Sequence, residues 1–389
     1  MATKSKSKLI KLQERAKSGD PESQYLLAEE YYEGGVLKCD YKKAFKWYEA
    51  AASQGHTIAQ ACLGYAYLRG KGTEINRQLA LKWFRNASRS GNAYAQFNIG
   101  MFYIFGYEVP QDFLKATRWF KKAAKGGHAG AQYQLADHYS RGMGIRRNAN
   151  AAFYWFKKAA LQDHIKAQYE LGRAYYLGLG VKENSRLAVR WFKKAAQAEN
   201  SKAQGWLAMC FSKGKGVRKD YKKAIYWARL SAEQNCPDGQ SALAGAYLFG
   251  NGVKRNIKKA IKLLEKAANL DDAFSQAYLG YLYWHGFEVK QDYKKAFSWF
   301  KKASDKADTE AQMYLGVCYH NGQGTRKNYK KSIYWLRLAA KQSNHEAQYF
   351  LGLSYQDGHG VSKNKRMANF WLQKAAQAGH KQAIALLTK

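Results

Sequence analysis

The 389-residue sequence predicts an all-α protein, a solenoid of about ten 36-residue helix–turn–helix repeats with half-repeat caps. Three observations lead to this fold class. A small residue followed by glutamine returns every 36 residues without an insertion, a glycine and then an Asp or Asn follow it at fixed distances, and apolar residues between these markers recur at helical spacing. Only three prolines occur in the chain, which also favours helices.

Each repeat begins at the small residue of that dipeptide. The ten starts are Ser23, Ala59, Ala95, Ala131, Ala167, Ala203, Gly239, Ser275, Ala311 and Ala347. They divide the chain into an N-terminal basic tail and capping helix over 1–22, ten tandem repeats over 23–382, and a partial C-terminal capping helix over 383–389. Half-repeats at both ends are expected, because the terminal repeats of a stacked array must cover an otherwise open apolar face.

The first half of each repeat predicts a helix that a glycine ends. With the start counted as position 0, position 4 is Leu or Ile, position 5 is Ala or Gly, and position 8 is Tyr or, once, Phe. These positions fall on one face of a helix. Glycine stands at position 11 in all ten repeats, from Gly34 to Gly358, and ends the helix because it tolerates a positive φ.

The second half predicts another helix, which begins after an Asp or Asn at position 17. A side-chain oxygen at that position can accept a hydrogen bond from an unpaired amide of the first turn. Position 21 is Ala in nine repeats, position 24 is Trp in nine, and position 28 is Ala in nine. We expect these tryptophan rings to interlock with small residues in the core. No repeat can bury such a face alone, so neighbouring repeats must stack.

Taken together, the residues follow A-Q-x-x-L-G-x-x-Y-x-x-G-x-G-V and then [DN]-x-x-K-A-x-x-W-[FY]-x-K-A-A-x-x-G-[HN]. This pattern resembles the Sel1-like repeat, a relative of the tetratricopeptide repeat, over nearly the whole chain. The resemblance implies an α/α superhelix with the second helices outside, and a role as an adaptor for other proteins. Some members of that family are cysteine-rich secreted proteins with bridged helix pairs. This chain lacks their regular cysteines, so those properties are not expected of it.

The repeat also accounts for the motifs that could suggest chemistry. G-x-G triplets occur seven times, but none has the Lys-Ser or Lys-Thr pair of a phosphate loop, and helices are predicted on both sides. His128 shares its position with His56, His164 and His380, and with Asn in other repeats, which is typical of a polar residue at a helix end. No serine lies in a nucleophile elbow. We therefore expect no catalytic, cofactor or metal site, and a protein that is not an enzyme.

Cysteine usage and hydropathy bear on the compartment. The five cysteines show no CxxC spacing and no regular pairing distance, which favours a reducing environment. No apolar run approaches the roughly 18 residues that span a bilayer, and the N-terminus lacks the apolar core of a secretory signal. We expect the cytoplasm of the producing cell. Export without an N-terminal signal, or delivery to a host cell, is the alternative.

Positions 2, 6 and 10 of the first helix lie opposite its apolar face and do not repeat. We expect them to line a concave groove that binds a protein partner, because Tyr, Phe and Arg anchor many protein interfaces. The alternative for any one of them is packing between adjacent first helices. The candidate groove residues are Tyr25, Tyr65, Phe97, Phe105, Tyr133, Asp137, Arg141, Tyr169, Arg173, Lys213, Phe249, Tyr281, His285 and Tyr349. The function predicted first is thus a scaffold for protein–protein interaction.

A second prediction rests on charge. The chain holds 65 Lys and Arg against 29 Asp and Glu, a formal net charge of +36. Such a chain attracts polyanions, so nucleic acid, an anionic membrane surface and acidic proteins are candidate partners. The alternative is a solvated outer face with no ligand. The candidate polyanion face consists of Lys121, Lys122, Arg146, Arg147, Lys157, Lys158, Lys193, Lys194, Arg218, Lys219, Lys254, Arg255, Lys301, Lys302, Arg326 and Lys327. With the tryptophans in the core, base stacking is not expected there.

Overall fold

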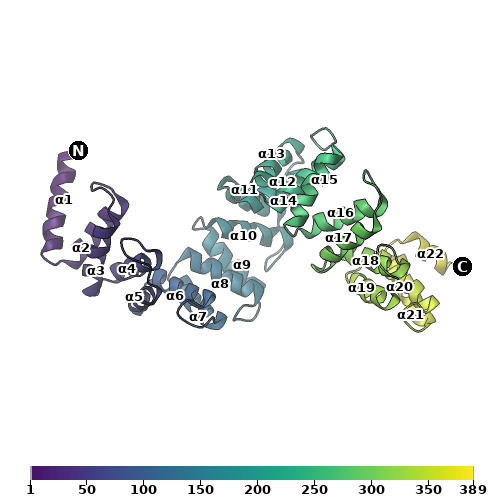
Figure 1. Ribbon diagram of the computed structural model, residues 1–389, viewed down its shortest axis with the longest axis horizontal. Helices are drawn as coiled ribbons and strands as arrows, with labels where there is room; N and C mark the ends of the chain where they lie inside the picture. The colour runs from purple at the N-terminus through teal and green to yellow at the C-terminus, as the bar shows by residue number, and fades with distance from the viewer. Residues whose placement is uncertain (1, 389) are drawn as a thin grey trace. The chain divides into compact units, whose positions relative to one another are not determined.

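A computed structural model describes residues 2–388 and contains twenty-two α-helices and no strand within that range (Figure 1). The chain divides into two compact units, Met1–Ala198 and Glu199–Lys389. Met1 and Lys389, which belong to the predicted capping regions, lie outside the described residues. Across residues 2–388, no helix has both the length and the apolar character that a membrane span requires.

The first unit contains eleven helices. They are α1 (Ala2–Lys17), α2 (Pro21–Glu33), α3 (Tyr41–Ser53), α4 (Thr57–Arg69), α5 (Arg77–Arg89), α6 (Ala93–Phe105), α7 (Phe113–Lys125), α8 (Ala129–Arg141), α9 (Ala149–Ala160), α10 (Ile165–Leu177) and α11 (Ser185–Gln197).

The second unit contains another eleven. They are α12 (Ser201–Lys213), α13 (Tyr221–Glu233), α14 (Pro237–Phe249), α15 (Ile257–Asn269), α16 (Ala273–His285), α17 (Tyr293–Ser304), α18 (Thr309–Asn321), α19 (Tyr329–Lys341), α20 (His345–Asp357), α21 (Lys365–Gln377) and α22 (Lys381–Leu387).

Consecutive helices pack against each other within each unit. The first helix of a repeat packs against its second helix, as α2 does against α3, and the second helix packs against the first helix of the next repeat, as α3 does against α4. The same arrangement recurs in the second unit, for example along α16, α17 and α18. The predicted all-α solenoid of paired helices is confirmed.

The predicted helix ends are also confirmed. Asp40 Oδ1 accepts a hydrogen bond from Lys43 N at 3.0 Å, and Gly34 adopts a φ of 75° at the end of α2. Every position 17 caps its helix in this way, and every position 11 is left-handed. In addition, the capping residue donates its own N–H to the carbonyl of position 8, as Asp40 N does to Tyr31 O at 2.8 Å. This bond closes the loop between the two helices.

The glutamine at position 1 joins neighbouring repeats. The Gln132 side-chain amide donates to Ala124 O at 3.2 Å, and Gln162 Nε2 donates to Gln132 Oε1 at 2.8 Å. Gln132 is buried, and a buried amide is costly unless it is hydrogen-bonded. The Ala-Gln dipeptide that marks each start in the sequence is therefore a packing signal.

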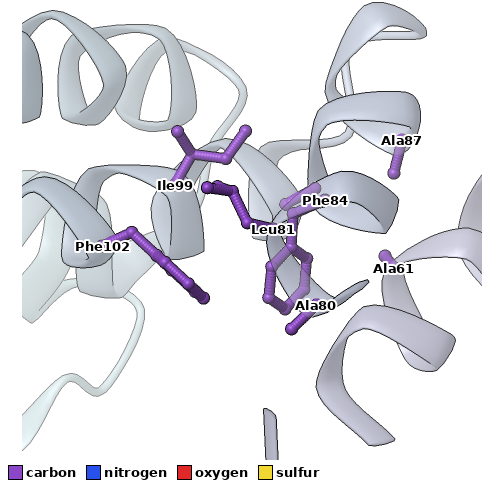
Figure 2. Packing of buried hydrophobic residues seen from close by; sticks show 8 residues of the cluster. Ala61, Ala80, Leu81, Phe84, Ala87, Ile99 and Phe102 are labelled. Atoms are coloured by element: carbon purple, nitrogen blue, oxygen red, sulfur yellow. The ribbon is translucent and has the colours of Figure 1, made fainter. Parts of the chain in front are cut away.

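The core forms where the second helix of one repeat meets first helices on either side. Phe84 of α5 lies beside Ile99 and Phe102 of α6, and the centroids of the two phenyl rings are 6.3 Å apart (Figure 2). The same kind of cluster recurs along both units, with alanines between the large side chains.

The residue that fills this core differs from the one predicted. The tryptophans at position 24, such as Trp119, are only half-buried, whereas the neighbouring position 25 is fully buried, as at Phe120. The reason is the small residue at position 5, which faces position 25. A Cβ added to Gly100 would lie 2.6 Å from Phe120 Cε1, so the glycine admits a flat ring against the helix backbone.

This packing predicts opposite effects for one substitution at two helical glycines. A Cβ at Gly172 would lie 2.6 Å from Phe192 Cδ1, and overpacking costs about 1–3 kcal/mol. A Cβ at Gly245 would meet no atom within 4 Å, which leaves only the gain of about 1 kcal/mol in helix propensity. We expect Gly172→Ala to lower the free energy of unfolding and Gly245→Ala to raise it. Urea denaturation measures both, and shifts of the same sign would contradict this account.

Candidate functional site

Four rings of the predicted groove stack on the imidazole that caps the next first helix. The pairs, with their centroid distances, are Tyr25–His56 at 4.8 Å, Phe97–His128 at 4.6 Å, Tyr133–His164 at 4.8 Å and Tyr349–His380 at 4.3 Å. All four position-2 rings are half-buried. One face of each ring thus serves the fold, and only the remaining edge can meet a partner.

The histidines themselves act as helix caps. His128 Nδ1 accepts a hydrogen bond from Ala131 N at 3.1 Å, and His164 Nδ1 accepts one from Ala167 N at 3.2 Å. The predicted helix-end role is confirmed. Burial lowers the pKa of both His128 and His164 below its usual value, because the charged ring loses its hydration.

Other groove residues of the first unit pair among themselves. Asp137 Oδ1 accepts from Arg141 Nε at 2.8 Å. Arg173 donates to Glu170 Oε2 at 2.8 Å, and its guanidinium lies 5.8 Å from the centroid of the Tyr169 ring. Tyr169 is only 9% exposed, so little of its ring is open to a partner. Tyr65 is half-buried, with its ring 6.4 Å from that of Tyr94.

In the second unit, two predicted groove residues are exposed to solvent. Lys213 and Phe249 are exposed at the ends of α12 and α14. Tyr281 and His285 belong to one cluster, in which the centroids of their rings are 4.4 Å apart. His285 Nε2 lies 3.2 Å from Tyr314 Oη.

The structure shows an exposed apolar edge that includes the predicted groove residues Phe105 and Phe249 and extends beyond them. It lies at positions 10 and 12, where each first helix ends and its turn begins. We call it the first-helix edge; it comprises Phe105, Tyr107, Leu177 and Leu179 in the first unit and Phe249 and Phe287 in the second. Phe105 is 55% exposed and stacks on Tyr107 at 5.2 Å. The available signal was an apolar residue beside the position-11 glycine, where other repeats have a charged residue such as Arg69 or Lys71.

All sixteen residues of the predicted polyanion face are exposed. Arg255 donates to Glu288 Oε1 at 2.8 Å, so part of its charge is compensated. Several lysines lie over indole rings, as Lys122 Nζ does 4.6 Å from the centroid of Trp119. Base stacking was not expected here because the tryptophans were placed in the core, but another ring is available: Tyr154 on α9 is 51% exposed beside Lys157 and Lys158. Tyr226 and Tyr334 occupy the equivalent position and are also exposed.

The buried cysteines have the character of core residues. Cys210 and Cys318 are fully buried, and Cys62 is half-buried. Burial raises the pKa of each of these three thiols to about 12. The thiolate, which is the nucleophilic form, is therefore suppressed at neutral pH.

Residues 2–388 contain one group of three potential metal ligands, formed by His345, Glu346 and His380. His380 Nδ1 accepts from Ala383 N at 3.2 Å, so the proton of the neutral ring belongs on Nε2. Nε2 faces Glu346 Oε2 at 3.2 Å without the geometry of a hydrogen bond. A metal at Nε2 would require the proton on Nδ1 and would abolish the cap of α22. The group is better explained as a helix cap beside a carboxylate.

The histidine caps predict a specific pH dependence. An unfolded histidine binds a proton near pH 6.5, whereas folded His128 and His164 have lowered pKa values. The unfolded state therefore binds more protons as the pH falls below about 6.5, and the free energy of unfolding decreases. Asn caps the same position at Asn92 and Asn200 without titrating.

We expect the double variant His128→Asn/His164→Asn to be less stable than the parent at pH 7.5, because Asn keeps the two caps but not the stacks on Phe97 and Tyr133. At pH 5.5 it should lose less stability than the parent. Urea denaturation at both pH values measures the difference. Equal losses in the two proteins would show that these caps do not carry the pH dependence.

Comparison with known proteins agrees with this architecture. The Sel1 repeat model matches ten consecutive segments: 21–56, 57–92, 93–128, 129–164, 165–200, 201–236, 237–272, 273–308, 309–344 and 345–380. A search of curated proteins found no match.

Two solved structures are similar to this chain. The protective antigen c5321 of uropathogenic Escherichia coli, described as an SLR fold, is 34% identical with a TM-score of 0.72; the match covers 96% of this chain and 80% of c5321. A Sel1 repeat protein from Oxalobacter formigenes is 31% identical with a TM-score of 0.55; the match covers 63% of this chain and 96% of that protein. On the ten repeat matches and the likeness to c5321, this chain belongs to the Sel1 repeat family.

Proposed function

We propose that this chain is a non-enzymatic scaffold that docks a protein partner on its first helices. Sel1-repeat proteins are generally scaffolds for protein interaction. The observation that carries the proposal for this chain is the first-helix edge, where large apolar side chains lie open to solvent at positions 10 and 12 of four of the ten repeats, those that start at residues 95, 167, 239 and 275. Repeated exposure of this kind is unfavourable unless another molecule covers the surface.

The edge suits a protein partner better than a small ligand. Phe105 and Tyr107 stack on each other, which holds both rings in place before a partner arrives. Rings fixed in this way lose little conformational entropy on binding. The polar groove residues Asp137 and Arg141, on the first helix of the next repeat, already pair with each other and can form the polar rim of such an interface.

A pair of substitutions tests this proposal. Phe105→Ser with Tyr107→Ser removes both exposed rings. Because the Tyr107 ring also packs on the buried Phe102, with centroids 6.2 Å apart, thermal unfolding checks that the fold persists. We expect the folded variant to lose its partners. Tyr154→Ser is the matched control, because it removes an equally exposed ring from a second helix. Affinity capture from the producing cell, followed by mass spectrometry, compares the three proteins. The proposal fails if the double variant retains every partner of the parent.

A second candidate function is the binding of a polyanion on the second helices. It is favoured by the side-by-side exposure of Tyr154 with Lys157 and Lys158 on α9, because a ring can stack on a base while the lysines contact phosphates. The lysines Lys193 and Lys194 extend the charge along α11 of the same unit. Binding of this kind would not depend on nucleotide sequence and would weaken with salt.

Fluorescence anisotropy with a single-stranded and a double-stranded oligonucleotide tests this alternative. Reversal of Lys157, Lys158, Lys193 and Lys194 to Glu should abolish binding of both at low salt. Tyr154→Ser should weaken binding of the single-stranded oligonucleotide alone, by about 1–3 kcal/mol for one stacked base. The Phe105→Ser/Tyr107→Ser variant is the control and should bind as the parent does. No binding by the parent at low salt would eliminate the alternative.

A further inference from the structure

A cavity of about 420 Å³ lies in the second unit among α12, α13 and α14. We call it the α14 cavity. Its inner wall contains three buried alanines, Ala208, Ala224 and Ala228. Lys213 and two phenyl rings line its outer part; Phe249 is 66% exposed and Phe274 is 59% exposed. Every lining residue lies between 205 and 274, so the cavity belongs to the second unit alone.

The cavity exists because α14 lacks the large side chains of other first helices. Its lining positions 2, 3 and 6 are Ser241, Ala242 and Gly245. A Cβ at Gly245 would meet no atom within 4 Å. Other repeats have long side chains at position 6, among them Tyr65, Met101, Arg173, Met209 and Tyr281.

A second omission lies on α13. Position 25 holds an aromatic ring in six of the ten repeats: Tyr48, Phe84, Phe120, Phe156, Phe192 and Phe300. In this repeat it is Ala228, which contributes to the inner wall. The core at this point is correspondingly small, and its buried members are Ala208, Ile225, Ala228 and Leu243. The helices keep their full length although these side chains are small, so the result is a cavity between ordered helices.

The lining defines the chemistry of an occupant. The inner wall is apolar, and an apolar cavity of about 150 Å³ already takes a benzene ring. Trp206 and Met209 add an indole and a thioether, and both groups pack well on aromatic rings. Ser212, Asn251 and Asp272 also line the cavity and supply groups that can hydrogen-bond to a peptide backbone. Together they match an aromatic side chain that is still attached to a polypeptide.

We propose that the α14 cavity receives an aromatic side chain from a protein partner, and that Phe249 and Phe274 cover the chain on either side of it. This inference rests on the proposed scaffold function and names one docking point for it. The exposed rings beside the cavity favour a polypeptide over a free small molecule, because a segment that enters the cavity must also pass over them. Phe249 is also a member of the first-helix edge in the second unit, so the docking point includes a residue of that edge.

Gly245→Met tests the proposal by filling the cavity from within. Met occupies the same position at Met101 and Met209, and the added side chain meets no atom near its Cβ, so the variant should fold. Phe249→Ser/Phe274→Ser is a second variant that alters only exposed rings. Thermal unfolding checks both proteins. Phe105→Ser/Tyr107→Ser, in the other unit, is the matched control.

The probes are peptides selected from a random phage-displayed library on the parent protein, together with N-acetyltryptophanamide, N-acetylalaninamide and free indole. We expect the selected peptides to share an aromatic residue. Gly245→Met should lower their affinity for the protein at least tenfold, whereas Phe105→Ser/Tyr107→Ser should leave it unchanged. Ligand-observed NMR should detect binding of N-acetyltryptophanamide to the parent and weaker binding to Gly245→Met. N-acetylalaninamide should bind neither protein.

Two contrary results separate this inference from the scaffold function. Peptides that bind the parent and Gly245→Met equally would leave the scaffold function standing and overturn the cavity as its docking point. Indole bound as tightly as N-acetyltryptophanamide would assign the cavity to a free small molecule. A library that yields no binder to the parent would count against both proposals.

Discussion

The fold depends on one contact, in which a ring or leucine of the second helix packs against a glycine or alanine of the first helix in every repeat except the one with Ala228. Phe192 on Gly172 and Leu336 on Gly316 are two examples, and in both an added Cβ would be within 2.7 Å of the facing side chain. The contact sets how closely the two helices approach. Three other features depend on that spacing between the helices and therefore recur with it every 36 residues. They are the half-buried tryptophan at the preceding position, the glutamine hydrogen bonds and the capped loops.

Because the framework repeats, residues that bind something must be sought where the repeat departs from its own pattern. The departures are of two kinds. At the first-helix edge, rings such as Phe105 stand at positions that are charged in other repeats, for example Arg69. Around α14, the departure is a loss, with Gly245 and Ala228 in place of long or aromatic side chains. Both lie on or between first helices, which is why the scaffold function is assigned to that face.

Much of this architecture could be predicted from the sequence because its causes are local. Asp40 as an N-cap and Gly34 as a left-handed C-cap follow from residue type and spacing. The choice of Trp119 over Phe120 as the buried ring was wrong, because helical periodicity does not distinguish two adjacent large residues. The facing partner decides, and only the glycine that accepts Phe120 identifies it.

The site was harder to predict because it depends on contacts between segments far apart in the sequence. Tyr133 stacks on His164, 31 residues later, and this pairing turns a supposed groove residue into a structural one. A signal for it was present, since every histidine at that capping position follows an aromatic residue at position 2 of its repeat. The α14 cavity left no comparable signal, because it is the sum of several small residues on three helices.

The high positive charge also has a structural explanation that does not require a ligand. Lys122, Lys194 and Lys302 each lie within about 5 Å of an indole ring on their own helix. A cation over an aromatic face is stabilising, by about 0.5–1 kcal/mol at an exposed site, and the lysine stem covers apolar surface that the half-buried tryptophan leaves open. The lysines are thus part of the packing at position 24. For this reason their number alone does not favour a polyanion, and the exposed Tyr154 is the more specific observation.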